Sequence, residues 1–125
     1  LNQQLNLQNH TIWTGRIEPE KLPGYYKAMD VLAMPSHWEG FGLSAAEGMA
    51  AGVPVAASDV PGLREVVGDA GELFPVNDDE RLAISIQKLL AGKKQFSQQA
   101  ADRIAKRFDL KKQQQKWLEA YQKKG

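Results

Sequence analysis

The sequence predicts an α/β domain of three layers, in which a parallel sheet of about four strands lies between helices. Short apolar runs alternate along the chain with segments of helical periodicity, and each run is followed by a turn signal. The intervening helices have about the length that a crossover between parallel strands requires. Because such crossovers cover a parallel sheet, we expect helices on both faces. The 125 residues show no internal linker, so residues 1–125 are expected to form one domain.

Four segments have the composition of strands. They are TIWTG (11–15), VLAMPS (31–36), PVAAS (54–58) and ELFPV (72–76). The helices expected between them are LPGYYKAMD, LSAAEGMAAG and PGLREVVG. Gly52 is placed to end one helix in a left-handed cap, Pro61 to occupy the first turn of the next, and Gly68 to follow its last periodic residue.

The pattern NDDERLAISIQKLLAG predicts a longer helix after the last strand. Asn77 and Glu80 have the spacing of a capping box at its start, and Gly92 ends it. Two further C-terminal helices are expected within about residues 95–123, roughly at 95–107 and 109–123. In the second, Leu110, Trp117, Leu118 and Tyr121 fall on one face, which we expect to be docked.

Charge is distributed unevenly along the chain. Residues 1–92 carry 6 Lys and Arg against 12 Asp and Glu, whereas residues 93–125 carry 10 against 3. The first interpretation of the basic end is a solvated helical face. A non-catalytic interaction domain, whose basic helices contact anionic lipid or an acidic partner, is the alternative. Nucleic acid is disfavoured, because the aromatic residues of this end are spaced for a buried helix stripe rather than a stacking platform.

Composition excludes several classes of site. There is no cysteine, so disulfides and thiolate metal sites are absent. His10 and His37 are isolated in the sequence, and we expect no metal site at either. No run approaches the roughly 18 apolar residues that a membrane span needs, and the polar start LNQQLNLQNH does not look like a signal peptide. We therefore expect a soluble, cytoplasmic domain.

One junction between a strand and a helix has the features of a ligand site. It is SHWEGFGLSAAEGMAAGVP, residues 36–54, and it lies at the carboxyl end of an expected parallel strand, where ligands of open α/β sheets bind. Gly40 and Gly42 let the backbone approach a ligand closely. The helix that begins near Leu43 or Ser44 directs unpaired N–H groups to the same place, which favours a phosphate or diphosphate.

Two carboxylates flank this junction. Glu39 precedes the helix and Glu47 lies about one turn inside it, and carboxylates are acceptors suited to vicinal hydroxyls. Structural alternatives remain open for both, since Glu39 fits a solvated loop and Glu47 fits a capping box with Ser44. An NAD-type dinucleotide-binding module is a further alternative, because GFGLSA fits G-x-G-x-x-A and Asp59 ends the next strand. The residues inserted before Gly40 and the short remaining chain count against it.

The stretch EGFGLSAAEGMAAGVPVAASDVPGLREVV resembles the signature of the retaining glycosyltransferases of the GT-B fold, group 1 or family 4. Their pattern is two glutamates separated by seven residues around a Gly-Phe-Gly-like turn, followed by a Gly-x-Pro-Val strand. The resemblance extends to YYKAMDVLAMPS before it and to GELFPVNDDERLA after it. It implies the Rossmann-like C-terminal domain of such an enzyme, which binds the nucleotide-sugar donor.

The resemblance also implies roles for individual residues. Glu39 is the catalytic-site carboxylate that faces the donor sugar hydroxyls, and Glu47 accepts from the ribose diol. Around the sugar and the phosphates lie Gly40, Phe41, Gly42, Leu43 and Ser44. The nucleobase lies near the turn at Gly15 and Arg16, although a surface role for Arg16 stays open.

Such enzymes transfer a sugar from a nucleotide diphosphate donor with retention of configuration and without a metal cofactor. Complete members add an N-terminal acceptor domain and an upstream Gly-Arg … Lys-Gly segment that grips the diphosphate, and this chain contains neither. We therefore expect the isolated chain to fold but to turn over no donor. The expected partners are a nucleotide sugar and the acceptor domain, with a peripheral contact to the inner face of a membrane allowed. The resemblance leaves the base, the sugar and the acceptor open.

Overall fold

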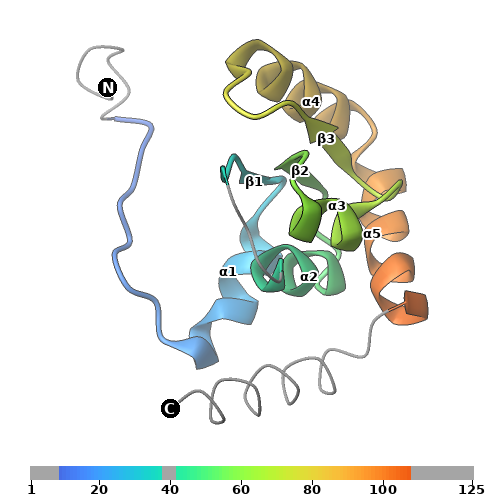
Figure 1. The fold of residues 1–125 in the computed structure, drawn as a ribbon. Coiled ribbons are helices and arrows are strands. Elements are labelled where there is room, and N and C mark those ends of the chain that lie inside the picture. Colours follow the sequence, from blue (N-terminus) through green and yellow to red (C-terminus); the bar gives the residue numbers. More distant parts are fainter. Residues whose placement is uncertain (1–8, 38–41, 108–125) are drawn as a thin grey trace, which may run out of the picture.

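The computed structural model describes residues 9–37 and 42–107, and these form an α/β fold. The elements in chain order are a 3-10 turn η1 (Pro19–Lys21), α1 (Leu22–Ala28), β1 (Leu32–Met34), α2 (Leu43–Ala50), β2 (Val55–Ser58), α3 (Pro61–Val67), β3 (Glu72–Phe74), α4 (Asp79–Ala91) and α5 (Lys93–Arg107) (Figure 1). Strands and helices alternate from β1 to α4, which confirms the predicted fold class.

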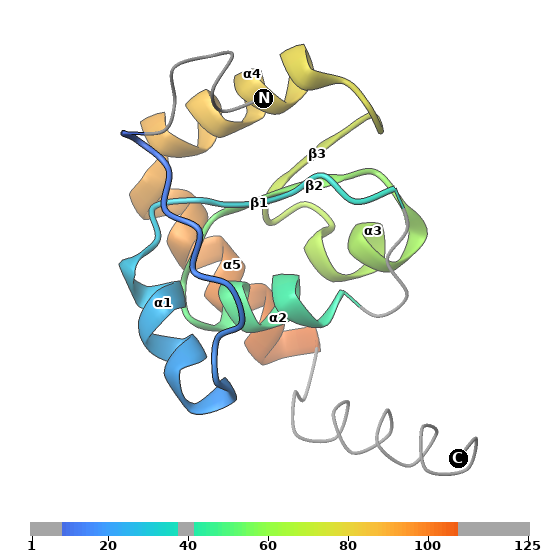
Figure 2. The same ribbon diagram turned by 90° about the vertical axis from the view of Figure 1, so that its left-hand side faces the viewer.

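The three strands form one parallel sheet in the order β1-β2-β3. Leu32 pairs with Val55, and Ala56 pairs with Glu72. All residues of the central strand β2 are buried, which explains its run of small apolar side chains. Figure 2 shows the sheet edge-on, with α4 on one side and α2, α3 and α5 on the other. Helices therefore cover both faces, as predicted.

The strand predicted at residues 11–15 is absent, so the described part of the chain has three strands rather than about four. Ile12 and Trp13 are 88% and 84% exposed, and the segment runs apart from the sheet (Figure 1). Its composition suits a strand, but strand propensity is expressed only when the backbone meets a neighbouring edge. No such pairing forms between this segment and β1.

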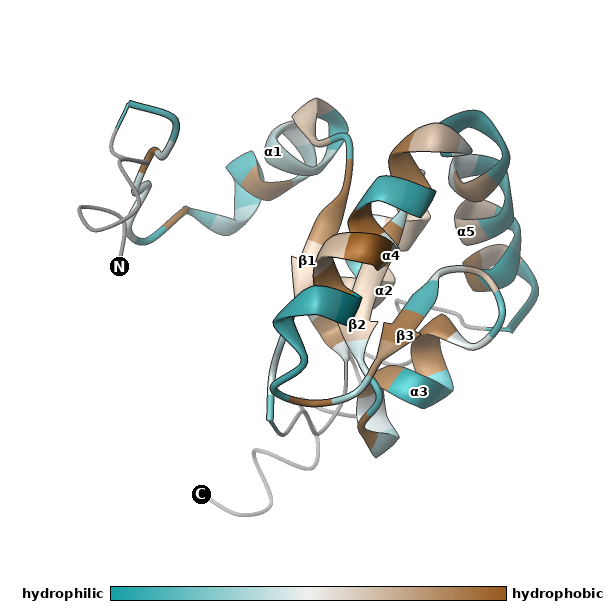
Figure 3. Cartoon of the chain, turned by 90° about the horizontal axis from the view of Figure 1, so that it is seen from above, coloured by the Kyte–Doolittle hydropathy of each residue, from teal (hydrophilic) through white to brown (hydrophobic). Residues whose placement is uncertain are grey.

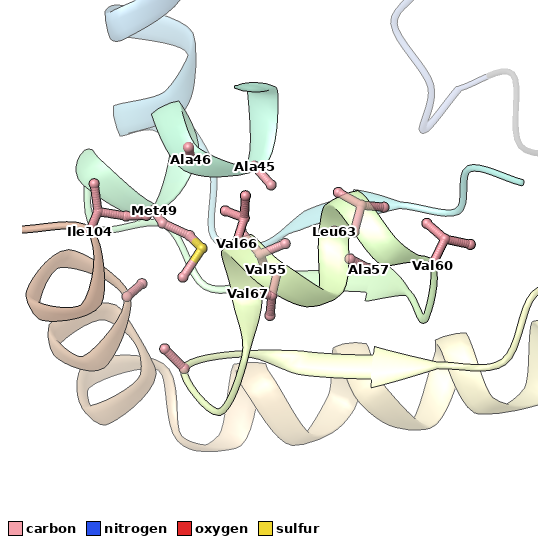
Figure 4. Packing of buried hydrophobic residues seen from close by; sticks show 12 residues of the cluster. Ala45, Ala46, Met49, Val55, Ala57, Val60, Leu63, Val66, Val67 and Ile104 are labelled. Carbon is pink, nitrogen blue, oxygen red and sulfur yellow. The ribbon is translucent and has the colours of Figure 1, made fainter. Parts of the chain in front are cut away.

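Apolar side chains from the two helical layers meet the sheet in separate clusters. Figure 3, coloured by hydropathy, shows apolar segments (brown) along the strands and on parts of the helices, between hydrophilic segments (teal). The larger cluster lies between the sheet and α2, α3 and α5, and in Figure 4 Met49 and Ile104 meet at one end of it, with Leu63 and Val60 at the other. Met49 and Leu63 are fully buried, and burial of such a side chain contributes about 1.5–3 kcal/mol. The smaller cluster joins α4 to the other face through Ala56, Phe74 and Leu89. Helix α2 is thus fixed on the core along its buried side.

Most predicted helix ends are confirmed. Gly52 follows α2 with a φ of 82°, Pro61 is the first residue of α3, and Gly68 with a φ of 50° ends that helix. Gly92 ends α4. Helix α5 begins at Lys93 rather than near residue 95 and extends to Arg107. The helix predicted at 109–123 lies outside the described residues.

The predicted capping box at the start of α4 is wrong. Asp78, not Asn77, is the N-cap, and its Oδ1 accepts a hydrogen bond from the Arg81 N–H at 2.9 Å. Asn77 instead takes a left-handed conformation with a φ of 65°. Both residues are good caps, and the turn after β3 places the second one at the helix start.

Helix α5 also holds the end of α3. The guanidinium of Arg103 donates from Nε to the Val66 carbonyl at 2.6 Å and from Nη2 to the Glu65 carbonyl at 2.8 Å. These carbonyls belong to the last turn of α3, whose acceptors have no partner within the helix. A cation at this end is also favoured by the helix dipole. Residues far apart in sequence are thereby joined beneath the sheet.

Candidate functional site

The carboxyl ends of the three strands lie at one edge of the sheet, because the strands are parallel. From this edge the chain enters α2, α3 and α4, so that the amino ends of these helices gather there (Figure 2). This is the edge at which open α/β sheets bind ligands. Of the predicted site residues, Glu39, Gly40 and Phe41 lie outside the described residues, whereas Gly42 to Glu47 lie in or beside α2.

Gly42 is the N-cap residue of α2, and it has no side chain of its own with which to cap this helix end. Its φ is 63°, and a Cβ atom there would lie 2.9 Å from Val66 Cγ2 and 3.1 Å from the Gly62 carbonyl oxygen. The absent side chain therefore lets the start of α2 pack against α3, which is a structural reason independent of any ligand. The N–H groups of the first turn, which includes Leu43 and Ser44, have no partner within the helix.

Glu47 lies one turn into α2 and faces α1. The Tyr26 hydroxyl donates a hydrogen bond to Glu47 Oε2 at 3.4 Å. Burial raises the pKa of Tyr26 above its ordinary value of 10.0, the negative charge of Glu47 raises it further, and a hydrogen bond with Ser44 lowers it. The phenol is therefore protonated at neutral pH and acts as a donor to the carboxylate.

The capping box considered for Ser44 and Glu47 does not form. Helix α2 begins at Leu43 and its N-cap is Gly42, so Ser44 lies inside the first turn instead of preceding the helix. The predicted pairing of Ser44 and Glu47 at a helix N-terminus is therefore wrong. Tyr26 is one side-chain partner of Glu47, and no spacing rule within one helix predicts this contact.

A hollow of about 440 Å³ lies between the start of α1 and α2. Glu47 and Tyr26 supply its polar groups, and the remaining lining is apolar: Pro19, Leu22, Pro23, Ala50 and Ala51. A carboxylate at the edge of an apolar cavity is the arrangement found in small-molecule sites, where few polar groups orient the ligand.

The turn predicted to lie near a nucleobase is not brought to this place. Gly15 has a φ of 64°, and an added Cβ there would meet nothing within 4 Å. Arg16 is exposed. Their segment runs apart from α2 in Figure 1. The structure thus assembles Gly42, Leu43, Ser44 and Glu47 and leaves Gly15 and Arg16 separate from them.

Asp59, the acid considered for a dinucleotide site, is held in an ion pair. Arg64 Nε lies 2.6 Å from Asp59 Oδ1, and Arg64 Nη2 donates to the Asp59 carbonyl at 3.4 Å. The ion pair joins the end of β2 to the first turn of α3. It occupies the carboxylate that a dinucleotide-binding fold would use to bind ribose. The observation counts against the NAD-type alternative.

A second contact at the same edge was not predicted from the sequence. His37 Nε2 lies 2.5 Å from Asn77 Oδ1, which joins the loop after β1 to the turn after β3. Because the amide oxygen only accepts, His37 is assigned the tautomer that carries a proton on Nε2. The two residues were visible in the sequence, but β1 and β3 are not neighbouring strands, so the contact depends on the course of the loops that leave the same edge of the sheet.

Neither a metal cluster nor a membrane span is found within residues 9–37 and 42–107. No group of three or more His, Asp or Glu side chains in these ranges is arranged to hold a metal ion. Nor does any helix there have the length and apolarity needed to cross a membrane.

Comparison with known proteins defines the class. The family model described as "Glycosyl transferases group 1" matches residues 1–124. The chain belongs to this family, which confirms the resemblance noted in the sequence.

Individual relatives agree with the assignment. The O-antigen chain mannosyltransferase B of Escherichia coli is 42% identical over 78 residues, which are 62% of this chain and 20% of that protein. A D-inositol 3-phosphate glycosyltransferase of Rhodococcus erythropolis is 37% identical over 109 residues, 84% of this chain and 25% of the relative. The chain therefore spans only a fifth to a quarter of the length of these two relatives.

Solved structures show the same fold. Sucrose-phosphate synthase from Thermosynechococcus elongatus superposes with a TM-score of 0.83 at 34% identity, covering 98% of this chain and 32% of that one. The C-terminal domain of a glycosyl transferase group 1 family protein (LpcC) from Francisella tularensis gives 0.74 at 28% identity, covering 85% and 57%. The second match is to an isolated C-terminal domain, the part that the sequence resemblance predicts.

Proposed function

We propose that this chain is the donor-binding part of a retaining glycosyltransferase that moves a sugar from a nucleotide diphosphate sugar to an acceptor such as a glycan or a lipid-linked saccharide. Membership in the group 1 family supports sugar transfer. The observation that carries the donor-binding role is the position of Glu47, one turn inside α2, where Tyr26 holds its carboxylate beside the hollow.

In this proposal, different residues of the site bind the diphosphate, the ribose and the sugar of the donor. The N–H groups at the start of α2 receive the diphosphate, and their dipole stabilises the charge that develops as the diphosphate leaves. Glu47 accepts hydrogen bonds from the ribose diol, and Glu39, Gly40 and Phe41 meet the sugar. Ser44 lies between the phosphate and ribose positions. Gly15 and Arg16 keep their predicted place near the nucleobase, which requires their segment to lie closer to α2 than it does in this structure.

The cations that would complete the site are proposed to come from outside this chain. The described cation on α3 at this edge, Arg64, is already paired with Asp59. The group 1 resemblance supplies an Arg and a Lys from an upstream segment, and an N-terminal acceptor domain as the partner. We therefore propose that the isolated chain binds donor weakly and transfers no sugar. The cytoplasmic location and the contact with the inner face of a membrane stay predictions.

Amide NMR titration tests the proposal directly. UDP-, GDP- and ADP-sugars are added separately to the labelled chain, and the backbone signals of Leu43, Ser44 and Glu47 are followed. At least one nucleotide sugar is expected to shift these signals, whereas signals from α4, on the other face of the sheet, stay in place. If none of the three donors perturbs α2, donor binding by this chain is contradicted.

A matched pair of variants assigns the shift to Glu47. Glu47→Gln keeps the size of the side chain and is expected to weaken binding, because a neutral amide is a poorer acceptor for a diol than a carboxylate. Glu65→Gln makes the same change on the exposed surface of α3 and is expected to leave binding unchanged. NADH serves as the probe for the dinucleotide alternative, and anionic vesicles serve for the interaction domain. Binding of either probe with no response to nucleotide sugars would favour that alternative.

A further inference from the structure

Tyr26 is held in place by the packing of α1 against α2. The residue is only 7% exposed. It faces Gly48, where an added Cβ would lie 2.8 Å from Leu32 Cδ2, 3.6 Å from Tyr26 Cδ1 and 3.7 Å from Tyr26 Cε1. The missing side chain at Gly48 therefore makes room for the aromatic ring and for Leu32, and a ring seated in this way has little freedom to rotate away from α2.

The hydroxyl of the Tyr26 ring forms a hydrogen bond with Glu47, the residue before Gly48 in α2. It donates to Glu47 Oε2 at 3.4 Å. A phenolic hydroxyl has one proton to donate and lone pairs to accept with. Tyr26 thus directs its single proton to the Glu47 carboxylate.

A hydrogen bond from a fixed neighbour helps a glutamate side chain to bind a diol, because it orients the carboxylate in advance. Glutamate has several rotatable bonds, and fixing a side chain of this kind costs conformational entropy. A hydrogen bond from a rigid neighbour offsets part of that cost before the ligand arrives. An ionised carboxylate accepts at about four lone-pair sites, so a hydrogen bond from Tyr26 does not prevent it from accepting from ribose hydroxyls.

We propose that Tyr26 is a positioning residue that holds the Glu47 carboxylate in the orientation that recognises a ribose cis-diol, and that it thereby sets the preference for ribonucleotide over deoxyribonucleotide donors. The inference rests on the proposed function, because it takes Glu47 as the ribose-binding group. It adds a residue from a different helix to the site and assigns it a measurable property, the discrimination between ribo and deoxyribo ligands.

The test compares affinities of matched ligands. UDP, GDP and ADP and their 2′-deoxy counterparts are titrated into the chain by calorimetry or NMR, and the ratio of the deoxy to the ribo Kd is calculated for each base that binds. A hydrogen bond to a charged group contributes about tenfold or more to affinity, so the wild-type ratio is expected to be about tenfold. In Tyr26→Phe, which keeps the ring and removes the hydroxyl, the ratio is expected to fall to about threefold or less.

A control variant is provided by the neighbouring residue. Tyr25→Phe removes the same hydroxyl from a side chain that is 41% exposed, and the ratio is expected to stay at the wild-type value. The thermal midpoints of both variants verify that they fold. The ratio is informative because a merely structural role of Tyr26 would weaken ribo and deoxy ligands equally.

The outcomes separate the two proposals. Equal weakening of both ligands in Tyr26→Phe, or an unchanged ratio, overturns the positioning role and leaves donor binding intact. A wild-type chain that binds diphosphates with no preference for ribose overturns the role of Glu47 and with it this inference. A wild-type chain that binds none of the diphosphates overturns the proposed function itself.

Discussion

Gly68 lies directly against the guanidinium of Arg103, at the point where α3 ends. An added Cβ at Gly68 would run into the Cζ and both terminal nitrogens of Arg103. The same guanidinium donates to the carbonyls of Glu65 and Val66. The absence of a side chain at one residue thus makes room for the charged group that holds the end of a helix.

Gly68→Ala is expected to lower the free energy of unfolding by about 1–3 kcal/mol. Alanine is strained at a φ of 50° and a ψ of −129°, and its methyl group would displace Arg103 from the two carbonyls. Chemical denaturation of the variant measures the loss.

A double-mutant cycle with Arg103→Met measures how much of the lost unfolding free energy results from displacement of the Arg103 guanidinium. If the alanine acts by displacing Arg103, the two substitutions together cost less than the sum of their separate effects. Strict additivity would assign the loss to backbone strain at Gly68 alone.

Gly42→Ala is expected to destabilise the chain by more than about 1 kcal/mol. The substitution combines a φ of 63° with close contacts to Val66 and to the Gly62 carbonyl. Gly24→Ala is the matched control, since Gly24 lies inside α1 with nothing within 4 Å of an added Cβ. Alanine there is expected to be neutral or stabilising, because it is the better helix former. Equal effects of the two substitutions on the urea midpoint would contradict the packing of Gly42 against α3.

Glu47→Gln is expected to lower the pKa of Tyr26. Burial is the larger cause of the raised pKa, and the charge of Glu47 adds to it. Removal of the charge should therefore bring the pKa part of the way back toward 10.0. Tyrosinate absorbance in a Tyr25→Phe, Tyr121→Phe background reports this group alone. A Tyr26 pKa unaffected by the substitution would contradict the contact.

The same shift determines how stability depends on alkaline pH. A tyrosine whose folded pKa exceeds its unfolded pKa contributes stability that is fully present below the unfolded value. That contribution is lost as pH rises from about 10 through the raised pKa. In Glu47→Gln the contribution should be smaller and its loss complete at a lower pH, which denaturation at a series of pH values measures.

EDTA is expected to leave nucleotide-sugar binding unchanged. In the proposed site the helix-end N–H groups and cationic side chains, rather than a metal, offset the charge of the diphosphate. Titrations of the same donor with EDTA, with Mg²⁺ and with Mn²⁺ check this. An affinity that falls tenfold in EDTA and returns on addition of either ion would contradict a metal-free site.

Rules based on residue composition and on Gly and Pro positions correctly predicted those elements whose limits depend on nearby residues. The apolar run PVAAS and the positions of Pro61, Gly68 and Gly92 were enough to place β2 and three helix ends. They failed where a choice depends on a distant partner. The run TIWTG has the composition of a strand but no edge to pair with, and the chain after β3 determines that Asp78 rather than Asn77 caps α4.

In the candidate site, too, local patterns were predictable from the sequence and contacts between distant residues were not. The glycine and the glutamate spacing around α2 were recognisable from the sequence, and the family match supports that interpretation. The contact between Tyr26 and Glu47 was not, because these residues are 21 positions apart and belong to different helices. The pairing of Asp59 with Arg64 at a separation of five residues also escaped prediction, since it depends on how α3 leaves the sheet.

The position of α5 has a consequence for the order in which this chain becomes structured. Met49 in α2 is covered by Ile104 in α5, and Ser97 donates to the Gly52 carbonyl at 2.5 Å. A nascent chain leaves the ribosome from its amino end, so the sheet and α2 emerge well before the helix that covers them. During that interval the apolar side of α2 is exposed to chaperones and to other nascent chains. Synthesis that stops before α5 is therefore expected to produce a chain that contains β1, β2 and β3 and still aggregates.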